Sequence, residues 1–203
     1  MSFTLIIIVI TAIISFLAFN NDELFNKLIL WPKRMDNPAE YYRLLTSGFI
    51  HADWMHLIFN MITLYCFGPT VEAYFTMMGA GSAFPLIYLL AIIVSSTPSF
   101  LKNRHNGYYR SLGASGGVAA ILFSSVYFNP WSKISFIFFP IGIPAILFAV
   151  IYLVYCAYMD RRGGSNINHG AHFWGSVFGF IATLLLDPSH GQIFIQQIVP
   201  GRL

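Results

Sequence analysis

Six long apolar segments, separated by short polar stretches, occupy most of this chain of 203 residues. A helix needs roughly 20 apolar residues to cross the hydrocarbon core of a bilayer, so the chain has room for about five to seven such helices. Charged residues make up only 9% of the chain and hydrophobic residues 57%, whereas soluble domains carry about 25% charged residues. The sequence therefore predicts an all-α, polytopic membrane protein, a bundle of six transmembrane helices that forms one membrane domain over residues 1–203.

The six expected spans differ in length and in the polar residues that they carry. They cover about residues 3–19, 54–76, 83–94, 113–128, 134–158 and 169–186. Residues 21–52 are too polar to span and mix Trp31 with leucines and lysines, which favours a loop at the lipid headgroups. The beginning of the chain has neither a positively charged region nor a small-residue cleavage site, so we expect the first apolar segment to be retained.

Charge and cysteine content exclude other classes of protein. The 11 basic residues are scattered and the net charge is only +3, so nucleic-acid binding is not expected. Cys66 and Cys156 lie far apart within apolar segments, and their spacing matches neither a metal motif nor a disulfide framework. We interpret both cysteines as packing residues.

Successive spans alternate in direction, so the second, fourth and sixth spans all begin at the same face of the membrane. These three beginnings hold His51, His56 and Asn60, then Gly113, Ser115 and Gly116, then His169 and His172. Polar side chains within a span are costly and usually face a cavity or a partner. Their convergence at one depth predicts a functional site.

Ser115 and His172 are the pair with catalytic potential. A lone serine in such a helix usually packs and bonds to its own backbone, but Gly113 and Gly116 here permit close approach of a neighbouring helix. Ser115 also lies in the first turn of its span, where unpaired N–H groups attract negative charge. Because a serine nucleophile needs a base, and His172 enters from the same face, we expect these two residues to act together.

His56 and Asn60 are four residues apart and share one face of the second span. They form either a polar contact between helices or donors to the oxyanion of an acyl transfer, each accounting for about 10²–10³ in rate. No carboxylate lies in the first turn of the second, fourth or sixth span, and Glu72 and Asp187 fall toward the opposite half of the bilayer. The sequence thus favours a Ser-His dyad.

Together these residues resemble the motifs of the rhomboid family of intramembrane serine proteases. The matching stretch from Arg43 to Glu72 contains His51-Ala-Asp-Trp-Met-His56-Leu-Ile-Phe-Asn60, and it is followed by Gly113-Ala-Ser115-Gly116 and by Ala171-His172 with Gly175 and Gly179. The motifs occur in the right order on the second, fourth and sixth spans. The chain therefore resembles the minimal six-span form of the family.

The resemblance implies a function and a role for each residue. Ser115 is expected as the nucleophile and His172 as its general base, with an oxyanion hole made by His56, Asn60 and the Ser115 N–H. Structural support is expected from Gly113, Gly116, Gly175, Gly179, Arg43 and Glu72. The implied partners are the lipid bilayer and transmembrane protein substrates, and neither a cofactor nor a metal is expected.

Hydrolysis within a membrane places further demands on substrate and enzyme. A helix hides its carbonyl groups in hydrogen bonds, so expected substrates carry small or helix-breaking residues near the cut. Water must reach Ser115 through a hydrophilic cavity that opens on the active-site face. The loop of residues 158–168, with Gly163 and Gly164 as a hinge, is the expected cover of that cavity.

Two positions depart from the family pattern, and one expectation conflicts with charge. Tyr42 precedes Arg43 where the family usually has a Trp-Arg pair. Ala119 stands where an aromatic residue often stacks on the catalytic histidine, which leaves open how the His172 ring is held. The resemblance implies a bacterial plasma membrane with the active site toward the external face, whereas the basic loops on that face favour the cytoplasm.

Two other functions would use some of the same residues. A non-catalytic rhomboid-like protein would bind membrane clients in the same groove, but such relatives typically lack the serine or the histidine. A metal site or metal transporter would use His51, His56, His169 and His172. Neither a zinc-protease motif nor an intramembrane carboxylate supports it.

Overall fold

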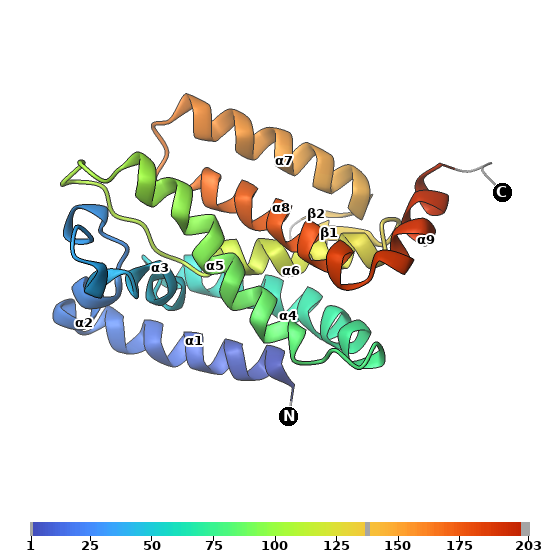
Figure 1. Cartoon of the computed structure of the whole chain (residues 1–203), viewed down its shortest axis with the longest axis horizontal. Coiled ribbons are helices and arrows are strands. Elements are labelled where there is room, and N and C mark those ends of the chain that lie inside the picture. Colours follow the sequence, from blue (N-terminus) through green and yellow to red (C-terminus); the bar gives the residue numbers. More distant parts are fainter. Residues whose placement is uncertain (1, 137–138, 200–203) are drawn as a thin grey trace.

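A computed structural model describes residues 2–136 and 139–199, and these residues are mostly helical (Figure 1). Their longer helices are α1 (Phe3–Phe19), α4 (Trp54–Met77), α5 (Ala83–Lys102), α6 (Ser115–Phe128), α7 (Ala145–Arg162), α8 (His169–Leu186) and α9 (Pro188–Ile198). Strands β1 (Lys133–Phe136) and β2 (Phe139–Pro144) form one antiparallel hairpin, in which Ile134 pairs with Ile143. The all-α prediction is confirmed.

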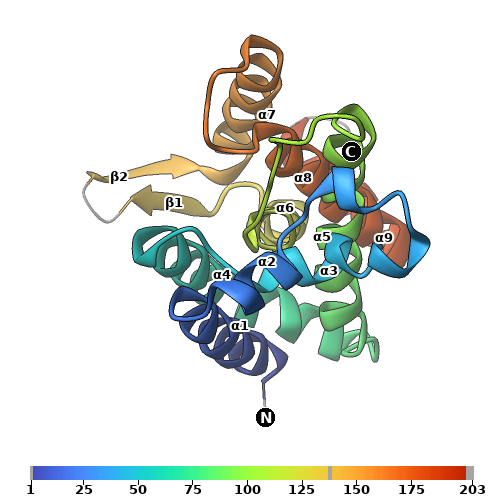
Figure 2. The same cartoon turned by 90° about the vertical axis from the view of Figure 1, so that its left-hand side faces the viewer.

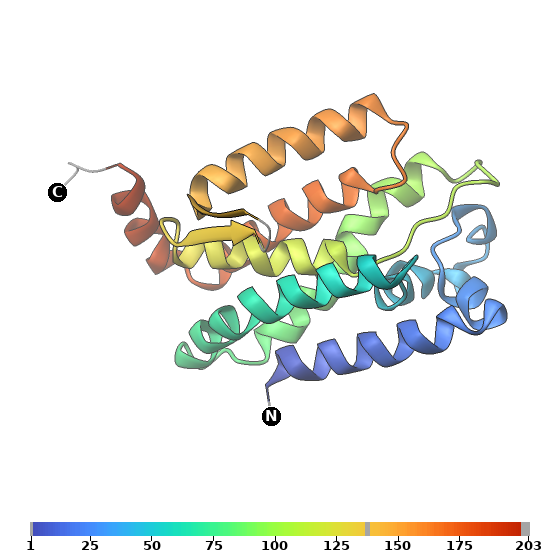
Figure 3. The ribbon, with the colours of Figure 1, turned by 180° about the vertical axis from the view of Figure 1, so that it is seen from behind.

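A series of short helices connects α1 to α4. These are α2 (Asp22–Leu28), η1 (Pro32–Arg34), η2 (Pro38–Glu40), α3 (Arg43–Thr46) and η3 (Ser47–Phe49). Proline begins both η1 and η2, since the first position of a helix does not need a backbone N–H. The whole connection gathers at one end of the helix bundle (Figure 3), so it forms a compact cap beside the start of α4.

Helix α6 lies at the centre of the bundle. Every residue from Gly116 to Phe128 is buried, because α4, α5 and α8 pack around it (Figure 2). Helix α7 lies at the periphery, mainly against α8. Ser115, the first residue of the central helix, therefore begins the most enclosed element of the fold.

The predicted ends of several spans agree with the structure, and two do not. Helices α1 and α8 begin and end as predicted. Helix α5 continues to Lys102 instead of ending near Val94. Pro98 lies inside this helix and does not end it, although its missing N–H leaves the carbonyl four residues earlier without a donor from the helix.

The fifth span is the other correction. It was predicted to begin at Ile134, but residues 133–136 and 139–144 are strands, and α7 begins at Ala145. Pro144 precedes the helix with an extended ψ of 133°, and a proline inside a helix would remove a hydrogen bond and clash with the preceding turn. The apolar run before α7 therefore pairs with itself as a hairpin.

Length and composition identify two helices in the described part of the chain, α5 and α8, that can cross a membrane. Helices α1 and α6 are apolar but shorter. The remaining spans of the six-span prediction are not established by this criterion.

Candidate active site

Ser115 is held at the beginning of α6 by an unusual backbone path. Gly113 has a φ of +114°, which a residue with a side chain rarely adopts, and its N–H donates to Ser47 O at 2.9 Å. Ala114 caps the helix without a side-chain hydrogen bond. The first N–H groups of α6 consequently lack partners within the helix, so an oxygen next to the partly buried Ser115 would find donors there.

His51 fixes the residue before the serine. The Ala114 N–H donates to His51 Nε2 at 3.3 Å, and the other ring nitrogen lies 2.9 Å from Ser15 Oγ on α1. Ser15 donates its hydroxyl hydrogen to Phe49 O, so His51 donates from Nδ1 and accepts at Nε2. Burial lowers the pKa of His51 to about 3, which favours the neutral ring that this network requires.

Helices α6 and α8 meet with their backbones in contact. A Cβ atom on Gly175 would overlap the Gly116 carbonyl, and one on Gly179 would overlap the Ala120 backbone. We call this contact between α6 and α8 the glycine seam. Farther along it, Thr183 Oγ1 lies 2.7 Å from Ser124 Oγ. Only glycine at these positions of α8 permits so close an approach.

His172 lies one turn before Gly175 on α8 and therefore shares its face. Gly175 touches Gly116, the residue that follows Ser115. The seam thus brings the start of α8 next to the start of α6. The imidazole of His172 is partly buried, and it also lies close enough to His56 on α4 for electrostatic coupling.

Tyr152 on α7 is a neighbour of His172 that the sequence did not reveal. Its hydroxyl lies 3.1 Å from His172 Nδ1, and the two rings are nearly parallel, with an angle of 13° between them. Ala119, which stands where the family often has an aromatic residue, is buried in α6. The tyrosine in the apolar segment of α7 was the available signal, because a buried phenol usually needs a hydrogen-bond partner.

His56 and Asn60 approach the site from α4. The ring of His56 lies against Gly113, where an added Cβ would be 2.6 Å from Cε1 and 2.8 Å from Nε2. Asp53 caps α4 by accepting the His56 N–H at 2.8 Å. Asn60 is buried and donates from Nδ2 to His56 O at 2.9 Å, which leaves its second amide hydrogen available.

Arg43 and Glu72 support the fold at opposite ends. Buried Arg43 donates to Glu40 and to the carbonyls of Asn26 and Ile29, and it thereby ties the short helices together. Its guanidinium lowers the pKa of the Glu40 carboxyl through a hydrogen bond. Glu72 accepts from the backbone N–H groups at the start of α1, far from His172. Both side chains thus make hydrogen bonds that connect separate elements of the fold.

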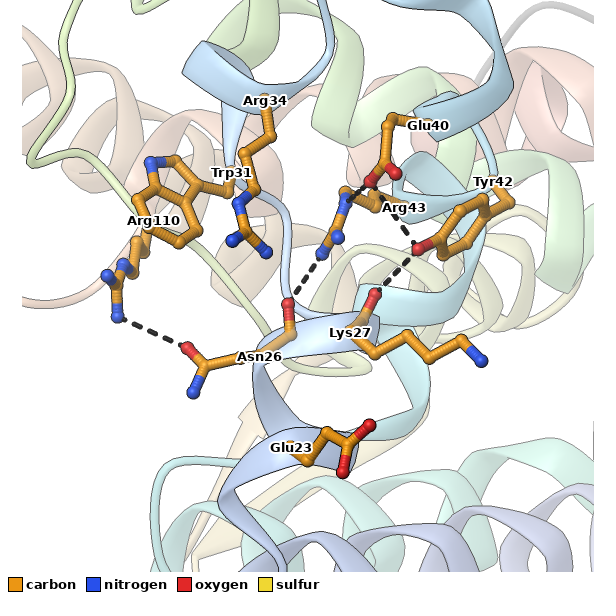
Figure 4. A pocket seen from close by; sticks show the side chains of 9 residues that line it. All are labelled: Glu23, Asn26, Lys27, Trp31, Arg34, Glu40, Tyr42, Arg43 and Arg110. Carbon is orange, nitrogen blue, oxygen red and sulfur yellow. Dashed lines mark hydrogen bonds and ion pairs between the residues drawn. The ribbon is translucent and has the colours of Figure 1, made fainter.

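A polar pocket of about 730 Å³ lies in the connection between α1 and α4 (Figure 4). Its nine lining residues are Glu23, Asn26, Lys27, Trp31, Arg34, Glu40, Tyr42, Arg43 and Arg110. Arg34 and Arg110 both stack on the Trp31 ring, 4.5 Å and 4.0 Å from its centroid. Neither Ser115 nor His172 lines this pocket, so it is separate from the candidate active site.

Comparison with known proteins bears on this arrangement. A family model described as the rhomboid domain matches residues 38–189, from before Arg43 to beyond α8. The chain belongs to the rhomboid family. The rhomboid match includes all three helices that carry the candidate site.

Several curated rhomboid relatives are similar over most of this chain. The mitochondrial RHOMBOID-like protein 12 of Arabidopsis thaliana is 30% identical over 81% of this chain and 52% of its own length. The rhomboid protease GluP of Bacillus subtilis is 32% identical over 81% of this chain and 30% of its own length. The rhomboid protease GlpG of Klebsiella pneumoniae is 26% identical over 81% of this chain and 55% of its own. The chain spans about half the length of the first two curated relatives that it matches.

Proposed function

We propose that this rhomboid protein is an intramembrane serine endopeptidase that uses a Ser115–His172 dyad. The observation that carries the proposal is the glycine seam, in which Gly175 of α8 touches the backbone of Gly116 in α6. Since Ser115 precedes Gly116 and His172 lies one turn before Gly175, this contact supports a nucleophile and a base next to each other.

The proposed reaction is acyl transfer to the serine, followed by hydrolysis. His172 removes the hydroxyl proton of Ser115 while the oxygen attacks the scissile carbonyl, and the same proton then goes to the leaving amine. The ester that remains on Ser115 is cleaved by water, which His172 deprotonates in turn. The products are two peptide fragments and the unchanged enzyme.

Negative charge develops on the carbonyl oxygen during both steps. The proposed donors to this oxygen are the Ser115 N–H, the His56 ring and the free amide hydrogen of Asn60. The unpaired N–H groups of α6 and the position of the His56 ring against Gly113 support that assignment. Removing one such donor typically costs about 10²–10³ in rate.

Tyr152 has a positioning role in this proposal and would hold the His172 ring, for which Ala119 provides no aromatic partner. Catalysis requires that His172 Nδ1–H donates to the phenol oxygen, because Nε2 is then unprotonated and can accept a proton from Ser115. The phenol hydrogen is left to interact with Cys156, which lies within hydrogen-bonding reach on the same helix. Tyr152 would thus orient the base as the third group of many serine hydrolases does.

The proposed substrates are transmembrane segments that unwind readily, in a bilayer that the protein spans six times. Gly163 and Gly164 both have positive φ, and an added Cβ at either would meet no atom of the described residues within 4 Å. That exposed pair supports the loop between α7 and α8 as a movable cover. Rhomboid relatives occur in both bacteria and mitochondria, so the bacterial plasma membrane and the outward-facing site remain predictions.

The test is cleavage of a panel of single-span membrane proteins by the purified chain in lipid vesicles. Ser115→Ala is expected to abolish cleavage while thermal unfolding stays unchanged. Ser125→Ala is the matched control, because Ser125 is a buried serine of α6 whose hydroxyl donates to Leu122 O within the helix. Cleavage by Ser115→Ala at the native rate would refute the proposal, and binding without cleavage by the native protein would favour a client-binding relative.

A further inference from the structure

Three side chains form a cluster between α7 and α8. The proposed reaction uses one of them, His172, as its base and does not require the cluster. Cys156 comes from α7, and His169 and His172 come from the first turn of α8. Each offers one sulfur or nitrogen atom, and these atoms all lie within 4.8 Å of one another. Cys156 is fully buried and His169 is 4% exposed, so the cluster lies inside the protein.

His169 has an unsatisfied nitrogen at this place. Its Nε2 lies 3.3 Å from Ser165 Oγ, but Nδ1 is buried and has no hydrogen-bond partner among the described residues. A buried polar atom without a partner is costly, and such atoms are uncommon in folded proteins. This unpartnered nitrogen points to a ligand that the fold itself does not supply.

The donor set identifies the chemical class of that ligand. One thiolate and two imidazoles suit a borderline-soft ion such as Zn²⁺, which accepts three protein ligands and leaves a fourth position open. Hard ions such as Mg²⁺ prefer oxygen ligands. Asp160 adds a negative charge near His169, which would favour a bound cation.

We propose that Cys156, His169 and His172 form an inhibitory zinc site. Binding replaces the thiol proton of Cys156, which is released to water, by the metal ion. It also occupies a nitrogen of His172, so the ring can no longer exchange a proton with Ser115. The binding itself does not depend on the proposed function, whereas the inhibition does.

The sequence did not indicate this site because its ligands belong to two helices. The spacing of the cysteines matches no metal motif, and the histidines at 169 and 172 are only one pair. Cys156 joins them through the packing of α7 on α8, which no sequence spacing encodes.

Cobalt binding to the metal-free, full-length protein in detergent tests the site directly. Co²⁺ replaces Zn²⁺ in such sites and produces a thiolate-to-metal absorption band. We expect one equivalent to bind with that band and to be displaced by Zn²⁺. Cys156→Ser should abolish the band, and His169→Asn should lower the affinity by about tenfold or more. Cys66→Ser, at the exposed cysteine of α4, should bind like the native protein.

The absence of a thiolate band in the native protein, or its persistence in Cys156→Ser, would overturn the proposal. A Zn²⁺ titration of substrate cleavage then tests the inhibition. The half-inhibitory concentration should rise by about tenfold or more in both ligand variants, and the zinc-free rate of His169→Asn should equal that of the native protein. Native cleavage that is insensitive to Zn²⁺ would overturn the inhibitory role. A protein that binds Co²⁺ as expected but cleaves nothing would instead contradict the proposed protease function.

Discussion

Helices α6 and α7 both flank α8, yet they contact it in different ways. At the α6–α8 seam, backbone touches backbone through Gly175 and Gly179, and every residue of α6 after Ser115 is buried. Helix α7 reaches α8 through long side chains, foremost Tyr152, and its outer face is exposed. In the proposed dyad, the α6–α8 seam therefore sets the distance between Ser115 and His172, whereas α7 sets the orientation of the His172 ring.

The seam should be the most sensitive part of the molecule. Gly179→Ala places a methyl group into the Ala120 backbone, and such overpacking typically costs about 1–3 kcal/mol. Because α8 must move away, cleavage should fall by about 100-fold. Thermal unfolding and cleavage in detergent measure both effects. Gly107→Ala is the control, since an added Cβ at Gly107 meets nothing within 4 Å; equal behaviour of the two variants would contradict a tight seam.

A lower pH should weaken the hydrogen bond from the Ala114 N–H to His51 Nε2 at the start of α6. The pKa of His51 is lowered to about 3 by burial, compared with about 6.5 in the unfolded chain, so the unfolded state binds the extra proton. The contribution of His51 to stability is therefore complete above about pH 6.5. It decreases toward pH 3 by up to about 1.4 kcal/mol per pH unit.

Thermal unfolding between pH 7 and pH 4 measures this dependence. His51→Gln, which cannot be protonated in this range, should be less stable at pH 7 but should lose stability more slowly as the pH falls. An unchanged acid dependence in the variant would assign the effect to other groups. His105→Gln, at an exposed loop histidine, is the control.

A substitution of Tyr152 tests how much α7 contributes to the orientation of His172. Tyr152→Phe keeps the ring and removes a hydrogen bond that is typically worth about 0.5–1.5 kcal/mol. The expected result is a fall in kcat of about threefold to tenfold with little change in KM or in thermal unfolding. Tyr155→Phe, at a half-exposed tyrosine of the same helix, should leave kcat unchanged. A native kcat in Tyr152→Phe would remove Tyr152 from the account.

The smallest expected effect comes from one isoleucine-to-valine substitution made in α6 and, separately, in α7. Ile121 on α6 is fully buried, and Ile151 on α7 is 56% exposed. Ile121→Val should lower the free energy of unfolding by about 0.5–1.5 kcal/mol, and Ile151→Val should change it by less than about 0.5 kcal/mol. Titration with a denaturing detergent gives both values. Equal losses would mean that α7 is packed as tightly as α6.

The sequence predicted those parts of the fold that follow from local pattern. The bounds of α1 and α8 are readable because polar residues end each apolar run abruptly. The alternating direction of successive spans also indicated that Ser115, His172 and His56 lie near the beginnings of three helices at the same face. The hairpin before α7 was missed because an apolar run with prolines has the same composition whether it forms a helix or a strand.

The contacts made by α7 could not be predicted for a different reason. The rotation of an outer helix about its axis depends on the side chains of its neighbours, and no local pattern specifies it. Tyr152 and Cys156 therefore read as ordinary apolar-segment residues, although they lie beside His172. Likewise, the place of His51 in the Ala114 network depends on Ser15, 36 residues away in the chain.

The most direct measurement is the reaction of the native protein with a fluorophosphonate, followed by mass spectrometry of the labelled peptides. An activated serine should react, and the account predicts a single adduct on Ser115 that is absent in His172→Ala. No adduct on Ser115, or an adduct that forms at the native rate in His172→Ala, would contradict a Ser115–His172 dyad.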